Sequence, residues 1–178
     1  MASGKMKRRM LIVDGYNVIN ARKDIFNGTL ADMRDRLLAM LMDYAGYSGQ
    51  QIILVFDAWM SDRQTRTTDH YGPVEVVYTQ KGETADHYIE RVCDEHAREV
   101  EYGRLEIRVA TSDGIEQTIV LGRGAIRLSA RELMYEMEQM RSQGKTGSVA
   151  VAASKRNPIA DHLPPSVRMK LEEMRRGK

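Results

Sequence analysis

The sequence contains very little cysteine and no long apolar run, and both absences narrow the class of protein. Only Cys93 is a cysteine among 178 residues, so no internal disulfide framework can form and the chain suits a reducing, cytoplasmic compartment. No apolar stretch approaches the ~20 residues that a helix needs to cross a bilayer. The basic N-terminus meets Asp14 after an apolar stretch too short for a secretion signal. We therefore expect a cytoplasmic protein without a membrane partner.

Two kinds of ligand-binding motif are also absent from the sequence. None of the four histidines has a second histidine or a cysteine at zinc-binding spacing. No glycine-rich loop of the Walker or dinucleotide-binding kind is present, because Gly122-Arg123-Gly124 is too short for either. The sequence therefore excludes a typical zinc site and predicts no nucleotide cofactor.

Two fully apolar runs that each end in an aspartate are the clearest positive signal. Residues 10–13 lead into Asp14 and residues 52–56 lead into Asp57, and residues 30–47 between them have helical spacing of apolar side chains. A strand, a helix and a second buried strand predict a βαβ unit with parallel strands. Both aspartates are then expected at the carboxyl edge of the sheet, where open α/β sheets bind ligands.

The rest of the chain continues the alternation of strands and helices. Further strands are predicted at residues 74–79, 105–111 and 125–128, further helices after Gly82 and from Ser129 to about Met140, an irregular loop at 59–72, and a low-order stretch from Gln143. Thr29 with Asp32, and Ser129 with Glu132, predict capping boxes at two helix starts.

Charge is unevenly distributed, which indicates separate segments. Residues 141–178 hold nine Lys and Arg against three Asp and Glu, whereas the remainder holds 18 basic and 22 acidic residues. We divide the chain into a basic extension (1–9), one α/β domain (10–143) and a basic tail with a short helix (144–178). A basic tail on an acidic body is typical of a protein that binds a polyanionic partner, although a solvated amphipathic helix has the same composition.

Five acidic side chains from four segments are expected at the carboxyl edge of the sheet. They are Asp14, Asp57, Glu83, Asp86 and Asp113. Crowded carboxylates repel one another, and an oxygen-only ligand set favours Mg²⁺ or Mn²⁺. Such ions serve phosphodiester cleavage. The alternative is that Asp14 caps the next segment and that Glu83 and Asp86 complement a helix dipole, which stabilises by about 0.3–1 kcal/mol. The dipole explains one of Glu83 and Asp86 but not why their helix starts at the sheet edge where Asp14 and Asp57 are expected.

Other chemistries that depend on strand-end acids fit less well. A phosphatase of the haloacid type would carry a second aspartate two residues after Asp14, where Tyr16 stands. A receiver domain would carry adjoining acids near the first strand and a lysine at a later strand end, and neither is present.

Several motifs together resemble one nuclease family. They are Leu11-Ile12-Val13-Asp14-Gly15-Tyr16-Asn17, Val55-Phe56-Asp57-Ala58, Glu83-Thr84-Ala85-Asp86, Ala110-Thr111-Ser112-Asp113, Gln117, Gly124-Ala125 and Ser129-Ala130-Arg131-Glu132-Leu133. In this order they are similar to the YacP-type NYN-domain family of PIN-like nucleases, one branch of which is a ribosome-associated mRNA endonuclease. The resemblance implies a three-layer α/β/α fold with a mainly parallel sheet, and metal-dependent cleavage of RNA.

The resemblance also implies roles for the acids. Asp14 and Asp86 match the essential positions, and Asp57, Glu83 and Asp113 match the supporting acids. We expect Asp14, Asp86 and Asp113 to hold Mg²⁺ or Mn²⁺. Asp57 and Glu83 would complete the shell or orient water.

The expected function is an endoribonuclease that cleaves single-stranded RNA, with mRNA on the ribosome as the implied substrate. Asn17 and Gln117 would position water or a phosphate oxygen. An acidic site cannot attract RNA, so basic side chains are expected around it. They are Arg63, Arg66, Lys81, Arg123, Arg127, Arg131, Lys155 and Arg156. The alternative is a non-catalytic RNA- or ribosome-binding module on the same fold, which would gain nothing from gathered acids.

Overall fold

The structure is a computed structural model that describes residues 6–58, 64–114, 118 and 122–154, with side chains up to residue 144. The elements are β1 (Arg8–Asp14), α1 (Gly15–Ala21), α2 (Leu30–Ser48), β2 (Gln51–Phe56), β3 (Thr67–Tyr71), β4 (Val74–Tyr78), α3 (Ala85–Glu95), α4 (Ala97–Glu101), β5 (Leu105–Ala110), β6 (Ile126–Leu128) and α6 (Ala130–Ser154). The chain divides into two compact units, Met1–Arg141 and Ser142–Lys178, and the description below concerns the first. Among the described residues no helix is both long and apolar enough to cross a membrane.

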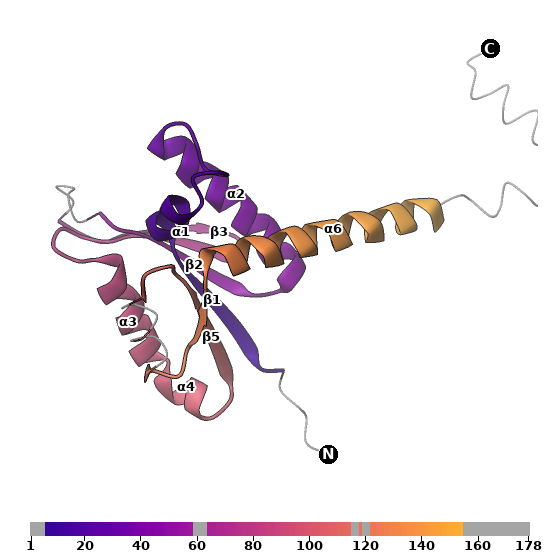
Figure 1. The fold of residues 1–178 in the computed structure, drawn as a ribbon. Coiled ribbons are helices and arrows are strands. Elements are labelled where there is room, and N and C mark those ends of the chain that lie inside the picture. The colour runs from indigo at the N-terminus through magenta and orange to yellow at the C-terminus, as the bar shows by residue number, and fades with distance from the viewer. Residues whose placement is uncertain (1–5, 59–63, 115–117, 119–121, 155–178) are drawn as a thin grey trace, which may run out of the picture. The chain divides into compact units, whose positions relative to one another are not determined.

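One mainly parallel sheet forms the centre of the first unit. Its strand order is β3-β4-β2-β1-β5-β6, and every neighbouring pair is parallel except β3 and β4 (Figure 1). Strand β1 lies between β2 and β5, and its residues 10–14 are buried, as a continuous apolar run between two helical layers requires. The predicted α/β fold is confirmed.

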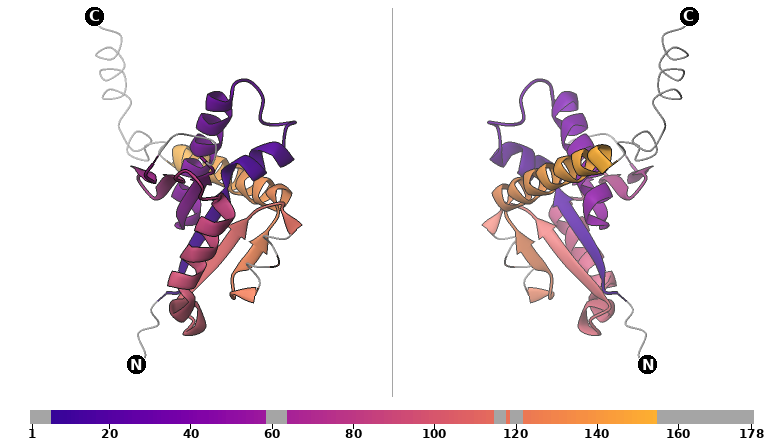
Figure 2. Two further views of the ribbon diagram at one scale, coloured as in Figure 1. Left: turned by 90° about the vertical axis from the view of Figure 1, so that its left-hand side faces the viewer. Right: turned by 90° about the vertical axis from the view of Figure 1, so that its right-hand side faces the viewer.

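Helices cover both faces of the sheet, which gives three layers (Figures 1 and 2). Alternate residues of a strand point to opposite faces. Leu11 packs with buried side chains of α1, α2 and α6, whereas Ile12 packs with buried side chains of α3. The sheet therefore has two separate cores, one on each face.

The two predicted capping boxes are confirmed. The backbone N–H of Asp32 donates to Thr29 Oγ1 at 3.1 Å, and the N–H of Thr29 donates to Asp32 Oδ2 at 3.0 Å. At the start of α6 the N–H of Glu132 donates to Ser129 Oγ at 3.1 Å, and the N–H of Ser129 donates to Glu132 Oε2 at 2.6 Å. These bonds satisfy backbone donors that have no partner inside the helix.

Two expectations about secondary structure are wrong. Residues 67–71 form the edge strand β3, not a loop, because backbone pairing with β4 holds them while most of their polar side chains stay exposed. Helix α6 continues past Met140 to Ser154, because a glycine inside a helix costs only about 1 kcal/mol and does not end it. The short helix predicted in the tail lies outside the described residues.

Gly15 is required for space, not for an unusual backbone angle. A Cβ at this position would lie 2.4 Å from Cε1 of Phe56 and 3.0 Å from the carbonyl oxygen of Val55. Phe56 is almost fully buried and has no room to move. Glycine therefore lets α1 begin directly against β2.

We expect Gly15→Ala to lower the free energy of unfolding by about 1–3 kcal/mol through overpacking. Gly46→Ala is the control, because nothing lies within 4 Å of a Cβ there and alanine favours the helix. Urea denaturation should show a loss in the first variant and an unchanged or increased stability in the second. Equal stability of the two variants would contradict the packing argument.

Candidate active site

The strand register places three of the predicted acids at one edge of the sheet. Asp14 is the last residue of β1 and pairs in register with Val55 of β2, so Asp57 follows two residues further on the neighbouring strand. On the other side Val13 pairs with Ala110, so Asp113 follows the end of β5. Neighbouring strands lie about 4.8 Å apart. The three acids therefore extend from adjacent strands, with Asp14 in the centre.

Asp14 is buried, with 7% of its surface exposed, and it also caps α1. The backbone N–H of Asn17 donates to Asp14 Oδ1 at 3.3 Å. The side-chain oxygen of Asn17 in turn accepts a hydrogen bond from the N–H of Ser112. Asn17 thus joins the start of α1 to the loop that carries Asp113. The capping alternative and the functional role are compatible at Asp14, because a capping carboxylate keeps further lone pairs.

Asp57 connects the sheet to α3. Its Oδ2 accepts a hydrogen bond from the N–H of Ala85, the first residue of α3, at 3.3 Å. The Thr84 hydroxyl caps the same helix by accepting from the N–H of His87 at 3.2 Å. Asp86 follows in the first turn of α3 and is exposed. This bond brings the helix that carries Asp86 to the edge where Asp14 and Asp57 lie.

Glu83 is buried, with 9% of its side chain exposed, and it forms ion pairs with two more exposed arginines. Arg66 donates two hydrogen bonds to it, from Nε at 3.1 Å and from Nη2 at 2.5 Å, and Arg91 donates another. The Arg66 guanidinium also lies 4.8 Å from the ring centroid of Tyr88. Burial raises the pKa of the Glu83 carboxyl, but the bonds from both arginines outweigh burial and hold that pKa below its usual value.

The oxygen atoms of the side chains at this edge are of the type that binds a hard divalent cation. The side chains there are carboxylates and amides, which Mg²⁺ and Mn²⁺ prefer. Within the described part of the chain, no three or more His, Cys, Asp and Glu side chains are close enough together to hold a metal ion. The acids are therefore positioned by the sheet and by hydrogen bonds to the backbone, and the structure shows no assembled ligand shell.

An aromatic row beside the acids was not predicted from the sequence. The ring centroid of Tyr16 lies 4.9 Å from that of Phe56, which lies 5.5 Å from that of Tyr78. Arg34 donates to the Tyr16 hydroxyl at 3.1 Å, and this bond raises the pKa of the Arg34 guanidinium. All three rings lie at or just beyond the carboxyl ends of β1, β2 and β4. The sequence signal was the aromatic residue that stands at or near each strand end.

Some of the basic residues predicted to contact RNA phosphates form ion pairs within the protein, and others do not. Arg66 is bound to Glu83, and Arg123 is bound to Asp94, from Nε at 2.6 Å, and to Glu90. The exposed residues Lys81, Arg127 and Arg131 have no ion pair with any described residue. The predicted residues that lie outside the described residues are Arg63, Gln117, Lys155 and Arg156.

Comparisons with known proteins show which family the chain and its fold belong to. A sequence model of the YacP-like NYN domain matches residues 11–176. The protein YacP of Bacillus subtilis (strain 168) is 40% identical over 133 residues, which are 72% of this chain and 75% of that protein. A crystal structure of Rae1 (YacP) from Bacillus subtilis is similar with a TM-score of 0.65 and 33% identity, over 94% of this chain and 95% of that chain. A mutant of Rae1 gives the same TM-score with 31% identity, over 93% and 99%.

The fold and the strand-end acids thus define a nuclease-like α/β domain, and NYN domains are a PIN-like nuclease family. The chain belongs to the YacP-like NYN-domain family. Nucleases of this kind generally use divalent metals. The predicted family is therefore confirmed, while the roles of the individual site residues and the division at residues 9 and 143 stay predictions.

Proposed function

We propose that this protein is an endoribonuclease that hydrolyses phosphodiester bonds of single-stranded RNA with Mg²⁺ or Mn²⁺. The observation that carries the proposal is the buried carboxylate of Asp14 at the centre of the acid edge, with Asp57 and Asp113 on the strands beside it. Burial of a carboxylate is costly unless it serves a bound group or is well hydrogen-bonded. The bond from the Asn17 N–H orients this buried carboxylate, and a carboxylate oxygen is a ligand that Mg²⁺ and Mn²⁺ prefer.

Asp14, Asp86 and Asp113 are the residues that would hold the ion. When bound, the ion would supply a Lewis acid and an activated water for attack on phosphorus. Asn17 fixes the Asp113 loop beside α1 through its bond from Ser112. Asp57 fixes the start of α3 through its bond from Ala85, so the chain itself orients the carboxylates.

The proposal extends to mRNA presented by the ribosome, within the cytoplasm. A polyanionic partner agrees with the excess of basic residues in 141–178, which hold nine Lys and Arg against three Asp and Glu. The competing function is a non-catalytic RNA- or ribosome-binding module. The acid edge argues against that function, because acids placed beside a polyanion weaken binding.

A cleavage assay separates the two functions. The purified full chain is incubated with end-labelled single-stranded RNA and, in parallel, with translating ribosomes carrying labelled mRNA. Each reaction contains Mn²⁺, Mg²⁺ or EDTA. We expect new internal ends with a divalent cation in at least one substrate and none with EDTA. RNA that is retained but intact in every reaction would establish the binding module instead.

A further inference from the structure

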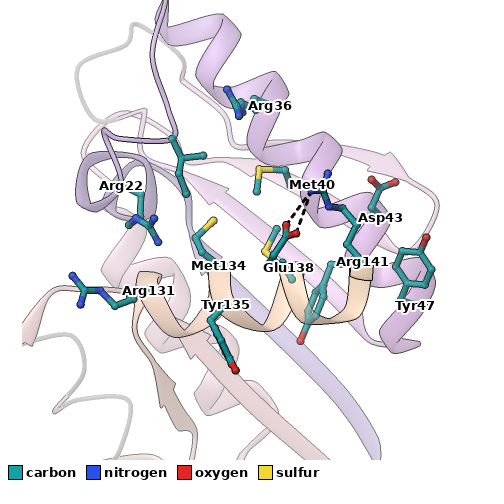
Figure 3. A pocket seen from close by; sticks show the side chains of 13 residues that line it. Arg22, Arg36, Met40, Asp43, Tyr47, Arg131, Met134, Tyr135, Glu138 and Arg141 are labelled. Atoms are coloured by element: carbon teal, nitrogen blue, oxygen red, sulfur yellow. Dashed lines mark hydrogen bonds and ion pairs between the residues drawn. The ribbon is translucent and has the colours of Figure 1, made fainter. Parts of the chain in front are cut away.

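A groove between α2 and α6 lies on the face of the sheet that α1 also covers (Figure 3). Its volume is about 570 Å³, and all its lining residues belong to the first unit. Two facing helical stripes form its walls, because residues three or four positions apart share one side of a helix. Arg36, Met40 and Tyr47 come from α2, and Arg131 and Tyr135 come from α6.

One end of the groove adjoins the acid edge. Arg22 and Arg131 lie at that end (Figure 3). Arg22 follows α1, a helix of seven residues that begins directly after Asp14, so it lies about one helix length, roughly 10 Å, from that carboxylate. Arg131 follows Ala130, whose N–H donates to the hydroxyl of Ser112, next to Asp113, at 3.4 Å. A single strand of RNA bound at the acids can therefore continue into the groove.

The groove combines cations, exposed aromatic rings and an apolar floor. Arg36 and Arg131 are exposed and form no ion pair with any described residue. Tyr47 is 53% exposed and Tyr135 is 66% exposed. In all, four arginines and two acids line the groove. Guanidinium groups bind phosphates and aromatic faces stack on bases, so this composition matches a single nucleic acid strand.

A partly buried polar network joins the two walls of the groove. The Tyr44 hydroxyl on α2 donates to Glu136 of α6 at 2.9 Å, and Arg108 of β5 donates to the same carboxylate at 2.5 Å. Gln50 donates to the Tyr44 hydroxyl at 3.2 Å. Both walls are thus fixed to each other and to the sheet, and a preformed site avoids the cost of ordering on binding.

We propose that this groove holds the nucleotides that flank the scissile bond of single-stranded RNA, with phosphates at Arg36 and Arg131 and a base stacked on Tyr135. The inference rests on the proposed function, because the substrate strand is what reaches the acid edge. The basic tail (144–178), with eight Lys and Arg against three Asp and Glu, is a poorer occupant because the rim arginines repel it.

Equilibrium binding tests the groove independently of cleavage. Anisotropy is measured with labelled RNA of about 4 and about 16 nucleotides, which span common single-strand site sizes, at several salt concentrations in EDTA. Arg36→Gln/Arg131→Gln should lower the log–log salt slope for the longer RNA by about 1.4, since each phosphate contact contributes about 0.7. Tyr135→Ala should weaken the same binding at least about fivefold, and neither variant should alter binding of the short RNA.

Arg98→Gln/Arg104→Gln is the matched control, because it removes the same charge from exposed arginines on and just after α4, on the opposite face. An equal change of slope in this control, or an unchanged slope in the groove variant, would overturn the inference. Intact cleavage with an unchanged slope would refute the groove and keep the nuclease. Binding through the groove without cleavage in any assay would keep the groove and refute the nuclease.

A fluorescent reporter identifies the occupant. Tyr135→Trp is introduced together with Trp59→Phe, since Trp59 is the single tryptophan of the chain. The longer RNA should quench the new tryptophan, and the short RNA should not. Emission that is insensitive to RNA would show that the groove holds something else. Emission that changes with protein concentration alone would show a second copy there.

Discussion

Asp14→Asn is expected to abolish RNA cleavage and to leave the free energy of unfolding unchanged or higher. The rate should fall by more than the roughly 10–100-fold that loss of an outer-shell group costs a metal site, because Asp14 is proposed to contact the ion itself. Stability should hold because asparagine caps a helix as well as aspartate does. The variant also removes a negative charge from a buried position.

Asp14→Ala separates the cap from the chemistry. It should lose cleavage equally and also lower stability by about 1 kcal/mol, because the bond from the Asn17 N–H disappears. Glu101→Gln is the control, an exposed acid on α4 that should change neither quantity. Thermal unfolding and initial cleavage rates in Mn²⁺ measure both effects. Retained cleavage in Asp14→Asn would leave Asp14 with a structural role alone.

The parts of the fold that follow from local patterns were predictable. The apolar runs of β1 and β2 and the capping boxes at Thr29 and Ser129 depend on residues close in sequence, and the structure confirms them. Strand β3 was not predictable, because an exposed polar edge strand is defined by its partner and not by its own pattern. Helix α1 was missed because its seven residues are too few for a clear period.

The common position of three acids at one sheet edge could be predicted from the sequence, but their hydrogen-bond and ion-pair partners could not. Parallel strands bring strand-end residues to one edge, so the gathering of Asp14, Asp57 and Asp113 followed from topology alone. The partners of Glu83 did not follow from the topology, because Arg66 lies 17 residues away on a segment whose path depends on β3. Charged side chains that a sequence offers to a ligand are often used inside the protein.

Removal of the ion pairs of Glu83 is expected to have a large effect on stability. Glu83→Gln should lower the free energy of unfolding by about 1–2 kcal/mol at neutral pH, because the half-buried Arg66 and the exposed Arg91 lose the charged acceptor that they share. Arg66→Gln should cost a similar amount, and the double variant should cost little more than either. In this double-mutant cycle, the coupling free energy between Glu83 and Arg66 should fall within about 0.5–3 kcal/mol. The exposed pair of Arg22 and Asp24 is the control and should show much smaller coupling.

The pH dependence of this cycle gives a second, independent check. Because the pKa of Glu83 is lowered in the folded protein, its contribution is present above the unfolded value of about 4.3 and is lost as pH falls through the folded pKa. The stability difference between wild type and Glu83→Gln should therefore be largest above about pH 5 and shrink in acid. If Glu83 positions α3 and does not hold the ion, the Mn²⁺ concentration for half-maximal cleavage should stay unchanged in Glu83→Gln. A raised Mn²⁺ requirement with a pH-independent stability difference would make Glu83 a ligand, and the ion pairs would then be secondary.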